Sequence, residues 1–363
     1  MRIGILTYYN VHNHGAVLQA NGLKTILKKM GHQVEFLQFD RNYDMLPSET
    51  SKKYTGGLSS VPFYAKYLLE KGIGNVLFNY SKKSMLDKYR KGHIPLGSYA
   101  DKFDGDLIVI GSDEVFSMEI GFNPCLYGLG LNCPNIISYA GCFGPTTEKD
   151  IIAYDKQDEI KAGLKGMKAI SVRDENSQSV VKEIAGENAQ IVCDPVILYG
   201  YKNEMNRFVP KEKDYIVVYS YDRSMQDAEE IKQIKAFAKK HNKKLFSVSY
   251  YHSWCDKNIQ ATPAQLLGWI KNADCVITDT FHGSVLSIVC NTPMIVKLRD
   301  NKNKLGFLLH EYNLEDRIIR DFGELSKCYN SVVDFNHVNS IVRDKRKQSY
   351  LFLKNTIKGI CYE

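Results

Sequence analysis

The chain has 363 residues, of which 44% are hydrophobic and 25% are charged, with a net charge of +7. This length exceeds what one hydrophobic core ordinarily holds, so we expect two domains. The positive surplus is mild and scattered, which fits an anionic substrate or a membrane surface and gives no support to nucleic acid as a partner.

The cysteines and the chain start indicate the compartment. There are nine cysteines, an odd number, and no two form a CxxC pair. Several lie in apolar stretches, which indicates small buried residues in a reducing compartment rather than disulfides or a zinc site. The first residues run directly into a strand pattern, and no stretch of about 18 apolar residues exists. We therefore expect a cytoplasmic protein, and peripheral contact with the inner membrane face stays open.

Short apolar runs typical of strands alternate with helix-length amphipathic segments along the whole chain. The predicted strands are 2–8, 33–39, 106–111, 135–140, 168–172, 190–193, 215–220, 244–250, 274–279 and 293–297. The predicted helices are 15–30, 175–185, 225–240, 263–271, 282–290 and about 337–358. This α/β alternation, with strands that are apolar throughout, indicates parallel sheets covered on both faces.

A polar stretch with glycine and proline, residues 199–213, separates the two halves of the chain. We interpret it as the link between two Rossmann-like domains. The predicted domains are 1–205 and 206–335, followed by a C-terminal helix in 336–363 that packs back toward the first domain.

Residues 41–102 form a predicted insertion that is rich in tyrosine, lysine and glycine. Two helices are expected in it, over 63–70 and 84–91, with a loop around Tyr54. The insertion could contact an acceptor or a membrane, and a solvated flap is an equally good interpretation.

The loop after the first predicted strand contains Asn13 and Gly15. Asn13 can cap the following helix, and Gly15 lets a ligand approach the backbone. In open α/β sheets this edge faces the ligand crevice. The loop is not GxGxxG, so a dinucleotide site has little support. A plain helix start is the alternative.

The third predicted strand ends in Gly111-Ser112-Asp113-Glu114. The glycine suits a tight exit from the strand, which displays the next side chains at the carboxyl edge. Asp113 could accept a proton from a hydroxyl group there. Taken alone, an aspartate that caps the next turn is the more ordinary interpretation.

Arg173 stands where another strand gives way to a helix. A guanidinium in that position can bind a phosphate or carboxylate through two hydrogen bonds. A salt bridge to Asp174 or Glu175 is the alternative. The later Asp194-Pro195 pair is typical of a turn.

His282 lies in the first turn of a helix that follows a buried strand directly. Asp279 or Thr280 can cap that helix, and its positive end is an anion site. The helix N-terminus disfavours a charged imidazole, whereas a bound phosphate would favour it. His282 could therefore bind a phosphate-bearing donor and deliver a proton to it.

Six segments, taken in order, resemble the polysaccharide pyruvyl transferase family. They are Asn13-x-Gly-Ala-Val-Leu-Gln, Gly111-Ser-Asp, Ser138-Tyr-Ala-x-x-Phe-Gly, Ser171-Val-Arg-x-x-x-Ser, Cys193-Asp-Pro and Thr278-Asp-x-Phe-His-Gly. The resemblance implies a fold similar to the two-domain GT-B architecture, with the site in the cleft. It also implies transfer of a pyruvyl group from phosphoenolpyruvate to two sugar hydroxyls, giving a cyclic ketal, without metal or organic cofactor.

The resemblance also implies roles for single residues. His282 looks like the family's donor-site histidine and Arg173 like its donor-binding arginine. That Asp113 acts as the base is our own hypothesis from its place at the strand end, and the resemblance adds only that it lines the crevice. The remaining expected contacts are Thr280, Gly283 and Ser284 at the donor, and Asn13, Gly15, Gly111, Ser112 and Glu114 along the crevice. The acceptor is expected to be a glycan or a lipid-linked oligosaccharide.

Two positions depart from the family pattern. Thr280-Phe281 stands where many relatives have Arg-Leu, which removes a cation that Lys297 or Arg299 would have to replace. Glu114 stands where relatives often have glutamine, which adds negative charge near an anionic donor. A nucleotide-sugar glycosyltransferase and a non-catalytic glycan-binding protein therefore stay open as alternatives.

Overall fold

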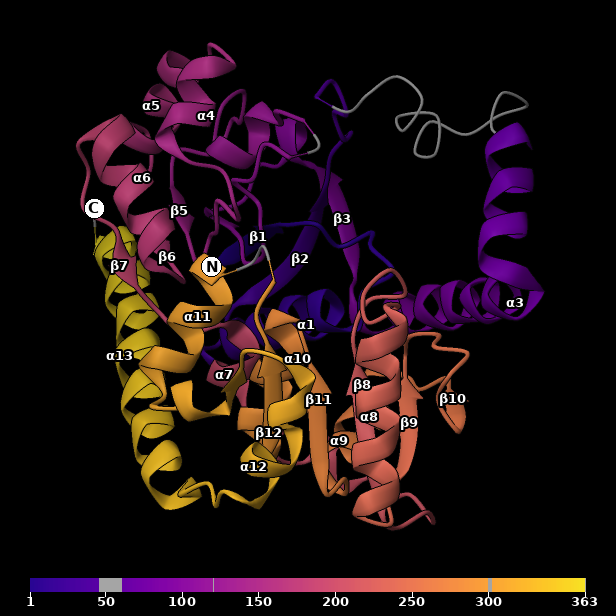
Figure 1. Ribbon diagram of the computed structural model, residues 1–363. Helices are drawn as coiled ribbons and strands as arrows, with labels where there is room; N and C mark the ends of the chain where they lie inside the picture. Colours follow the sequence, from indigo (N-terminus) through magenta and orange to yellow (C-terminus); the bar gives the residue numbers. More distant parts are fainter. Residues whose placement is uncertain (46–60, 120, 300–301, 363) are drawn as a thin grey trace.

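The structure, a computed structural model, describes residues 1–45, 61–119, 121–299 and 302–362. Two parallel sheets, one built from each half of the chain, form its centre, and helices cover them (Figure 1). The predicted α/β class with parallel sheets is confirmed.

The first sheet has the strand order β3-β2-β1-β4-β5. Its strands are β1 (Arg2–Leu6), β2 (Gln33–Gln38), β3 (Leu96–Tyr99), β4 (Leu107–Ile110) and β5 (Ile136–Ser138). The short pair β6 (Ser171–Val172) and β7 (Gln190–Ile191) continues beside β5, where Ser138 N donates to Ala169 O at 3.0 Å. The strand order reverses between β1 and β4, and ligands of open α/β sheets bind at the carboxyl ends of such strands.

The second sheet has the strand order β10-β9-β8-β11-β12-β13. Its strands are β8 (Tyr215–Tyr219), β9 (Lys244–Val248), β10 (Lys257–Ile259), β11 (Cys275–Thr278), β12 (Met294–Lys297) and β13 (Ile318–Ile319). Every residue of β8 and β11 is buried, as expected for strands covered on both faces. The order reverses between β8 and β11, so this sheet also has a ligand-facing switch point.

All six predicted helices are present, with ends shifted by a few residues. Helices α1 (His14–Lys29), α6 (Glu175–Ala185), α8 (Ala228–Lys240), α9 (Pro263–Lys271), α10 (Phe281–Cys290) and α13 (Phe335–Tyr362) match them. The sequence did not predict α4 (Glu148–Ala153), α5 (Gln157–Lys165), α7 (Pro195–Tyr199), α11 (Lys302–Glu311) and α12 (Leu325–Asn330).

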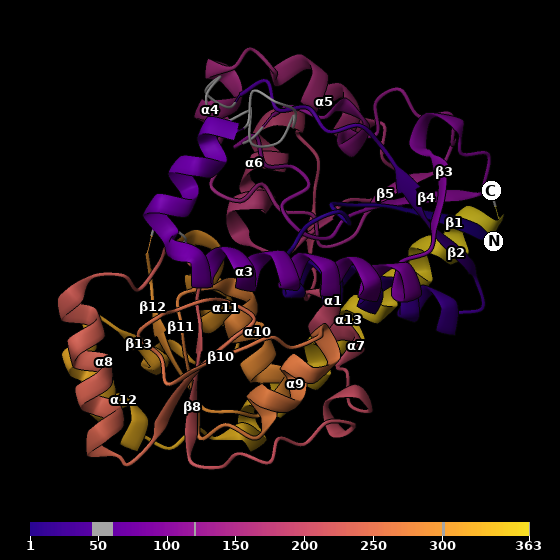
Figure 2. The ribbon, with the colours of Figure 1, turned by 90° about the vertical axis from the view of Figure 1, so that its right-hand side faces the viewer.

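The two helices expected in the insertion are present, with different ends. They correspond to the two helical segments of α3 (Val61–His93), which meet at a kink at Gly72, where φ is 76°. The expected loop around Tyr54 lies outside the described residues. Figure 2 shows α3 running alongside both sheets. It contacts both halves: Arg90 Nη1 donates to Val11 O at 2.7 Å, and Lys82 Nζ donates to Ser249 O at 3.1 Å.

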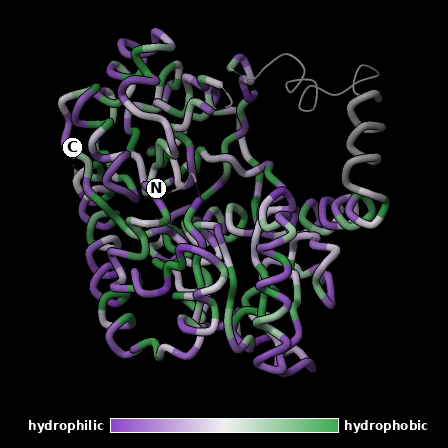
Figure 3. The backbone as a smooth tube through the Cα atoms, viewed as in Figure 1, coloured by the Kyte–Doolittle hydropathy of each residue, from purple (hydrophilic) through white to green (hydrophobic). Residues whose placement is uncertain are grey.

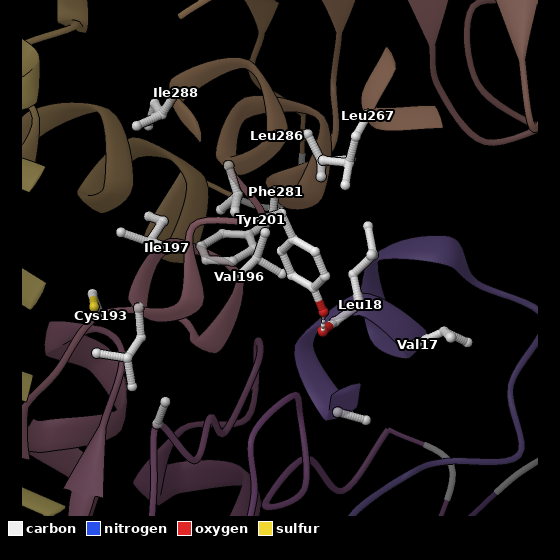
Figure 4. Packing of buried hydrophobic residues seen from close by; sticks show 14 of the residues in the cluster. Val17, Leu18, Cys193, Val196, Ile197, Tyr201, Leu267, Phe281, Leu286 and Ile288 are labelled. Carbon is white, nitrogen blue, oxygen red and sulfur yellow. Dashed lines mark hydrogen bonds between the residues drawn. The ribbon is translucent and has the colours of Figure 1, made fainter. Parts of the chain in front are cut away.

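One hydrophobic cluster extends from the first sheet to the second. Its centre lies where α1 and α7 meet α9 and α10, with Leu18, Val196, Leu267 and Leu286 packed together (Figure 4). The hydroxyl of Tyr201 donates to Leu18 O inside this cluster. The two halves are therefore joined by packed side chains as well as by the chain itself.

Helix α13 runs back from the second half toward the first. It is amphipathic, and Figure 3 shows hydrophilic and hydrophobic residues mixed along it. The Oγ of Ser349 accepts from Cys193 N at 2.9 Å, and Arg346 Nε donates to Ile197 O at 2.5 Å. The two termini lie close together, with Cys361 Sγ 3.2 Å from Met1 Sδ. The predicted domain limits stay a prediction.

Candidate active site

Two helix starts, one from each half of the chain, meet at His282. Asn13 caps α1 by accepting from Gly15 N at 2.9 Å, and Thr280 caps α10 by accepting from Gly283 N at 3.0 Å. Gly15 lies directly against the imidazole, because a Cβ at that position would be 2.2 Å from His282 Cγ. Only a residue without a side chain allows this approach of α1 to α10.

The imidazole of His282 is buried and electrically neutral at pH 7. Its Nε2 lies 3.9 Å from Asp194 Oδ2 and has no hydrogen-bond partner among the described residues. Burial lowers the pKa of His282 to about 4, against the opposing charge of Asp194. The sequence predicted a neutral histidine from its position at the helix start. The structure shows that burial is the larger cause.

The guanidinium of Arg173 lies near the same carboxylate oxygen of Asp194 as His282. Its Nη1 lies 3.5 Å from Asp194 Oδ2, and its Nη2 lies 3.7 Å from Asp113 Oδ1. Its Cζ lies 4.4 Å from the centre of the Phe281 ring, within the range of a cation–π contact. The alternative salt bridge to Asp174 does not occur, because Asp174 caps α6 by accepting from Ser177 N at 2.8 Å.

The loop after β4 places Asp113 and Glu114 beside this guanidinium. Gly111 has φ 118°, and a Cβ there would be 2.3 Å from Tyr139 O, so the turn requires glycine. Asp113 has φ 79°, an unfavourable conformation that is found most often at functional sites. Glu114 Oε1 lies 4.0 Å from Arg173 Nη2 and forms an ion pair with Lys304 of α11.

Sequence reasoning missed two residues of this cluster. The sequence pattern assigns Asp194 to a turn, and it does cap α7 by accepting from Val196 N at 2.8 Å. Its second carboxylate oxygen, however, faces both Arg173 and His282. The signal available was its place after a strand at the same sheet edge. Lys304 had no such signal, because it lies within a polar stretch far from any strand end.

Several expected contact residues have structural roles. The Thr280 hydroxyl is occupied by capping and by Thr278 Oγ1 at 3.0 Å. Gly283 allows α10 to pack on β11, because a Cβ there would be 2.2 Å from Thr278 Oγ1. The hydroxyls of Ser112 and Ser284 are buried and have no hydrogen-bond partner in the described part of the chain.

The expected replacement cation is neither Lys297 nor Arg299. Arg299 Nε donates to Asp279 Oδ2 at 2.8 Å and its Nη2 to Glu230 Oε2 at 2.8 Å, while Lys297 contacts Arg320 O. Lys304 supplies the second positive charge of the cluster instead.

The cluster thus contains two cations, three carboxylates and one neutral imidazole. They are Arg173, Lys304, Asp113, Glu114, Asp194 and His282. Within the described ranges, no group of three or more His, Cys, Asp or Glu side chains could hold a metal ion. None of the helices there is long and apolar enough to cross a membrane. The arrangement can bind an anion between the two cations, hold a proton on His282 and accept one on Asp113.

The comparisons with known proteins concern both family and fold. A model of the family described as polysaccharide pyruvyl transferase matches residues 13–301. No curated protein matches the chain.

Solved structures share the fold at low sequence identity. Trehalose-6-phosphate synthase OtsA matches with a TM-score of 0.54 and 11% identity, over 98% of this chain and 99% of that one. The structure of S. aureus MnaA with UDP gives 0.53 and 10%, over 98% and 96%. The spinosyn forosaminyltransferase SpnP gives 0.51 and 10%, over 99% of each chain. These similarities confirm the predicted GT-B-like architecture.

Proposed function

The chain belongs to the polysaccharide pyruvyl transferase family, and on that premise we propose that it transfers a pyruvyl group from phosphoenolpyruvate to two hydroxyls of a glycan. The products are a cyclic ketal and phosphate. The observation that supports this most is a cluster in which buried Arg173 lies beside half-buried Asp113 and buried Asp194, and Asp194 lies beside His282 of the second half.

The donor binds between the cations. Phosphoenolpyruvate carries a phosphate and a carboxylate, and the positive groups of this cluster among the described residues are Arg173 and Lys304. A guanidinium matches either group with two parallel hydrogen bonds. Lys304 becomes available when an incoming anion takes the place of Glu114, so donor binding exchanges one ion pair for another.

The donor itself supplies the condition for proton transfer. Free His282 is neutral because its pKa is about 4. A phosphate bound close to the ring raises that pKa, so His282 binds a proton together with the donor. It gives this proton to the methylene carbon of phosphoenolpyruvate, which leaves an oxocarbenium-like centre at the neighbouring carbon.

The acceptor reacts at that centre. One sugar hydroxyl forms a bond to the cationic carbon and passes its proton to Asp113. The second hydroxyl then displaces phosphate from the same carbon, and its proton leaves with the phosphate. Donor and acceptor have to be aligned beforehand because the cation is short-lived, and a crevice between two packed halves provides that alignment.

Thermal unfolding with phosphoenolpyruvate tests the donor. A ligand that binds only the folded protein raises the free energy of unfolding, by about 2.7 kcal/mol at a ligand concentration of one hundred times its Kd. The melting temperature rises accordingly. Millimolar phosphoenolpyruvate should stabilise the native chain and Arg343→Ala, a charge removal on the exposed surface of α13, but not Arg173→Ala. Arg173→Lys keeps the buried charge and controls for misfolding.

The same measurement separates the alternatives. Stabilisation by UDP-sugars without any by phosphoenolpyruvate would favour a glycosyltransferase, which the UDP complex of S. aureus MnaA makes worth including. Stabilisation by neither, with or without added glycan, would count against the proposed reaction.

A further inference from the structure

A second cationic group lies at the carboxyl edge of the first sheet, outside the reaction cluster. Arg41 follows β2, and its Cζ lies 4.7 Å from the centre of the Tyr8 ring. Its Nη2 is buried and has no hydrogen-bond partner, and no described carboxylate forms an ion pair with it. Arg41 as a whole is half-buried, and a guanidinium offers five donors, so its Nη2, without a partner among the described residues, is available to a ligand.

The surroundings of Arg41 are positively charged. Arg90 of α3 donates through Nη1 to Val11 O at 2.7 Å and pairs through Nη2 with Asp87. Burial lowers the pKa of Arg90, Asp87 raises it, and the charge of Arg41 lowers it, so the two guanidiniums repel each other. Asp87 is also shared with His12, at 3.5 Å from its Nε2. Asp87 balances the charge of Arg90, whereas no ion pair with a described carboxylate balances the charge of Arg41, so the group as a whole favours binding of an anion.

This group is continuous with the reaction cluster through Tyr8. The Tyr8 hydroxyl accepts from Asn123 Nδ2 at 3.4 Å, and its ring packs beside Phe39 at a centroid distance of 6.0 Å. Burial raises the pKa of Tyr8, and the charges of both Arg41 and Asp113 act on it. Tyr8 follows β1, which lies between β2 and β4 in the first sheet, and Thr7 Oγ1 donates to Ser112 O at 2.8 Å. Tyr8 therefore lies between Arg41, which follows β2, and Asp113, which follows β4, so one ligand can reach from the carboxylate to the guanidinium.

We propose that Arg41, held over the face of Tyr8, binds a phosphate group carried by the acceptor sugar, so that the acceptor is a glycosyl phosphate rather than a neutral glycan. The inference rests on the proposed function, because it takes the ligand at Asp113 to be the acceptor. The planar guanidinium of Arg41 matches two oxygens of a phosphate with parallel hydrogen bonds, and titration with glucuronate separates a phosphate from a carboxylate.

Isothermal titration calorimetry with glucose 1-phosphate and with glucose tests the proposal on the full chain. The native protein should bind the phosphate ester at least tenfold more tightly than the neutral sugar. Arg41→Gln should remove that difference, whereas Arg343→Gln, a matched loss of charge on the exposed surface of α13, should keep it. Arg41→Lys retains the charge and should keep part of the preference, which also controls for folding.

Two further variants and ligands locate the site and the source of the charge. Arg41→Gln should leave phosphoenolpyruvate binding unchanged, and Arg173→Gln should weaken it while preserving glucose 1-phosphate binding. UDP-glucose that binds more tightly than glucose 1-phosphate in an Arg41-dependent way would identify a nucleotide-linked phosphate.

Three results would overturn the assignment: equal affinity for the ester and the sugar, an Arg41→Gln variant that binds like the native chain, or stronger Arg41-dependent binding of glucuronate. Failure of phosphoenolpyruvate to bind would contradict the donor alone, because the glucose 1-phosphate titration needs no donor.

Discussion

At the scale of single residues, the buried histidine at the crevice makes the stability of the fold depend on pH. His282 has a pKa of about 4 in the folded chain and about 6.5 in the unfolded chain. Between these values the unfolded chain binds more protons, so the free energy of unfolding falls as the pH drops from about 6.5 to about 4. His14, with a pKa of about 3, adds to the same trend.

His282→Gln should remove part of this dependence. Urea denaturation should show that the free energy of unfolding of the native chain falls between pH 7 and pH 5, with about 2 kcal/mol of this fall due to His282. The fall should be smaller by that amount in the variant. His310→Gln, at an exposed histidine, should behave like the native chain. An unchanged pH dependence in His282→Gln would show that the imidazole is not held neutral by burial.

Glu114 gives a prediction about donor affinity. Its carboxylate lies 4.0 Å from the guanidinium of Arg173 and pairs with Lys304, so it competes with an anionic ligand for both cations. Glu114→Gln should therefore tighten phosphoenolpyruvate binding by about tenfold, or about 1.4 kcal/mol. Titration calorimetry with Glu187→Gln as an exposed control measures this. Weaker phosphoenolpyruvate binding in Glu114→Gln would contradict this competition and would indicate that the Glu114 side chain contacts the acceptor instead.

The sequence predicted those site residues that follow strand ends. Arg173 directly follows β6, and Asp113 and His282 each follow their strand, β4 and β11, by a few residues. Because the carboxyl ends of parallel strands meet at one edge, the pattern alone brings them near each other. Asp194 follows a strand too, but its proline gave a sufficient local explanation. Lys304 reaches the cluster only through the packing of α11, which no local pattern encodes.

At the scale of elements, the approach of α1 to α10 sets the position of the histidine. Gly15→Ala would place a methyl group 2.2 Å from His282 Cγ, with bonded helix backbone on one side and the buried ring on the other. We expect overpacking to lower the free energy of unfolding by about 1–3 kcal/mol. The activation free energy of the reaction should rise by more than that, because the imidazole moves.

A glycine elsewhere in a helix supplies the control. A methyl group added at Gly359 in α13 would meet no neighbouring atom within 4 Å, so Gly359→Ala should be neutral or stabilising by up to about 1 kcal/mol. Urea midpoints and initial rates of both variants check this. A Gly15→Ala protein with native stability and rate would show that α1 does not fix the ring.

The strands that the sequence did not predict share a physical feature. The strands β3, β10 and β13 are edge strands of two to four residues, and β3 and β10 have no fully buried residue to mark them. Edge strands bury too little to carry the apolar run that identifies a strand. The central strands and long helices were predicted because each buries a continuous face. The two helices expected in the insertion are the segments of α3 on either side of the kink at Gly72.

At the scale of the whole molecule, the two sheets are less independent than two linked domains would be. The hydrophobic cluster that includes Leu18, Leu267 and Leu286 continues from one sheet to the other. Helices α3 and α13 also contact both halves. The crevice thus has a packed floor, and the residues that meet there are positioned by contacts that neither half could make alone. A break in composition near residue 205 could not reveal this.

This shared core predicts a single cooperative unfolding transition. Both tryptophans, Trp254 and Trp269, lie in the second half, so their fluorescence reports on that half only. Cys142 is buried beside Asp174 in the first half, and its reaction with a thiol reagent reports on the other. If the halves unfold together, fluorescence, thiol exposure and far-ultraviolet circular dichroism should give the same urea midpoint. Separate midpoints would show that each sheet has a core sufficient for its own stability, and the crevice would then open by local unfolding at its floor.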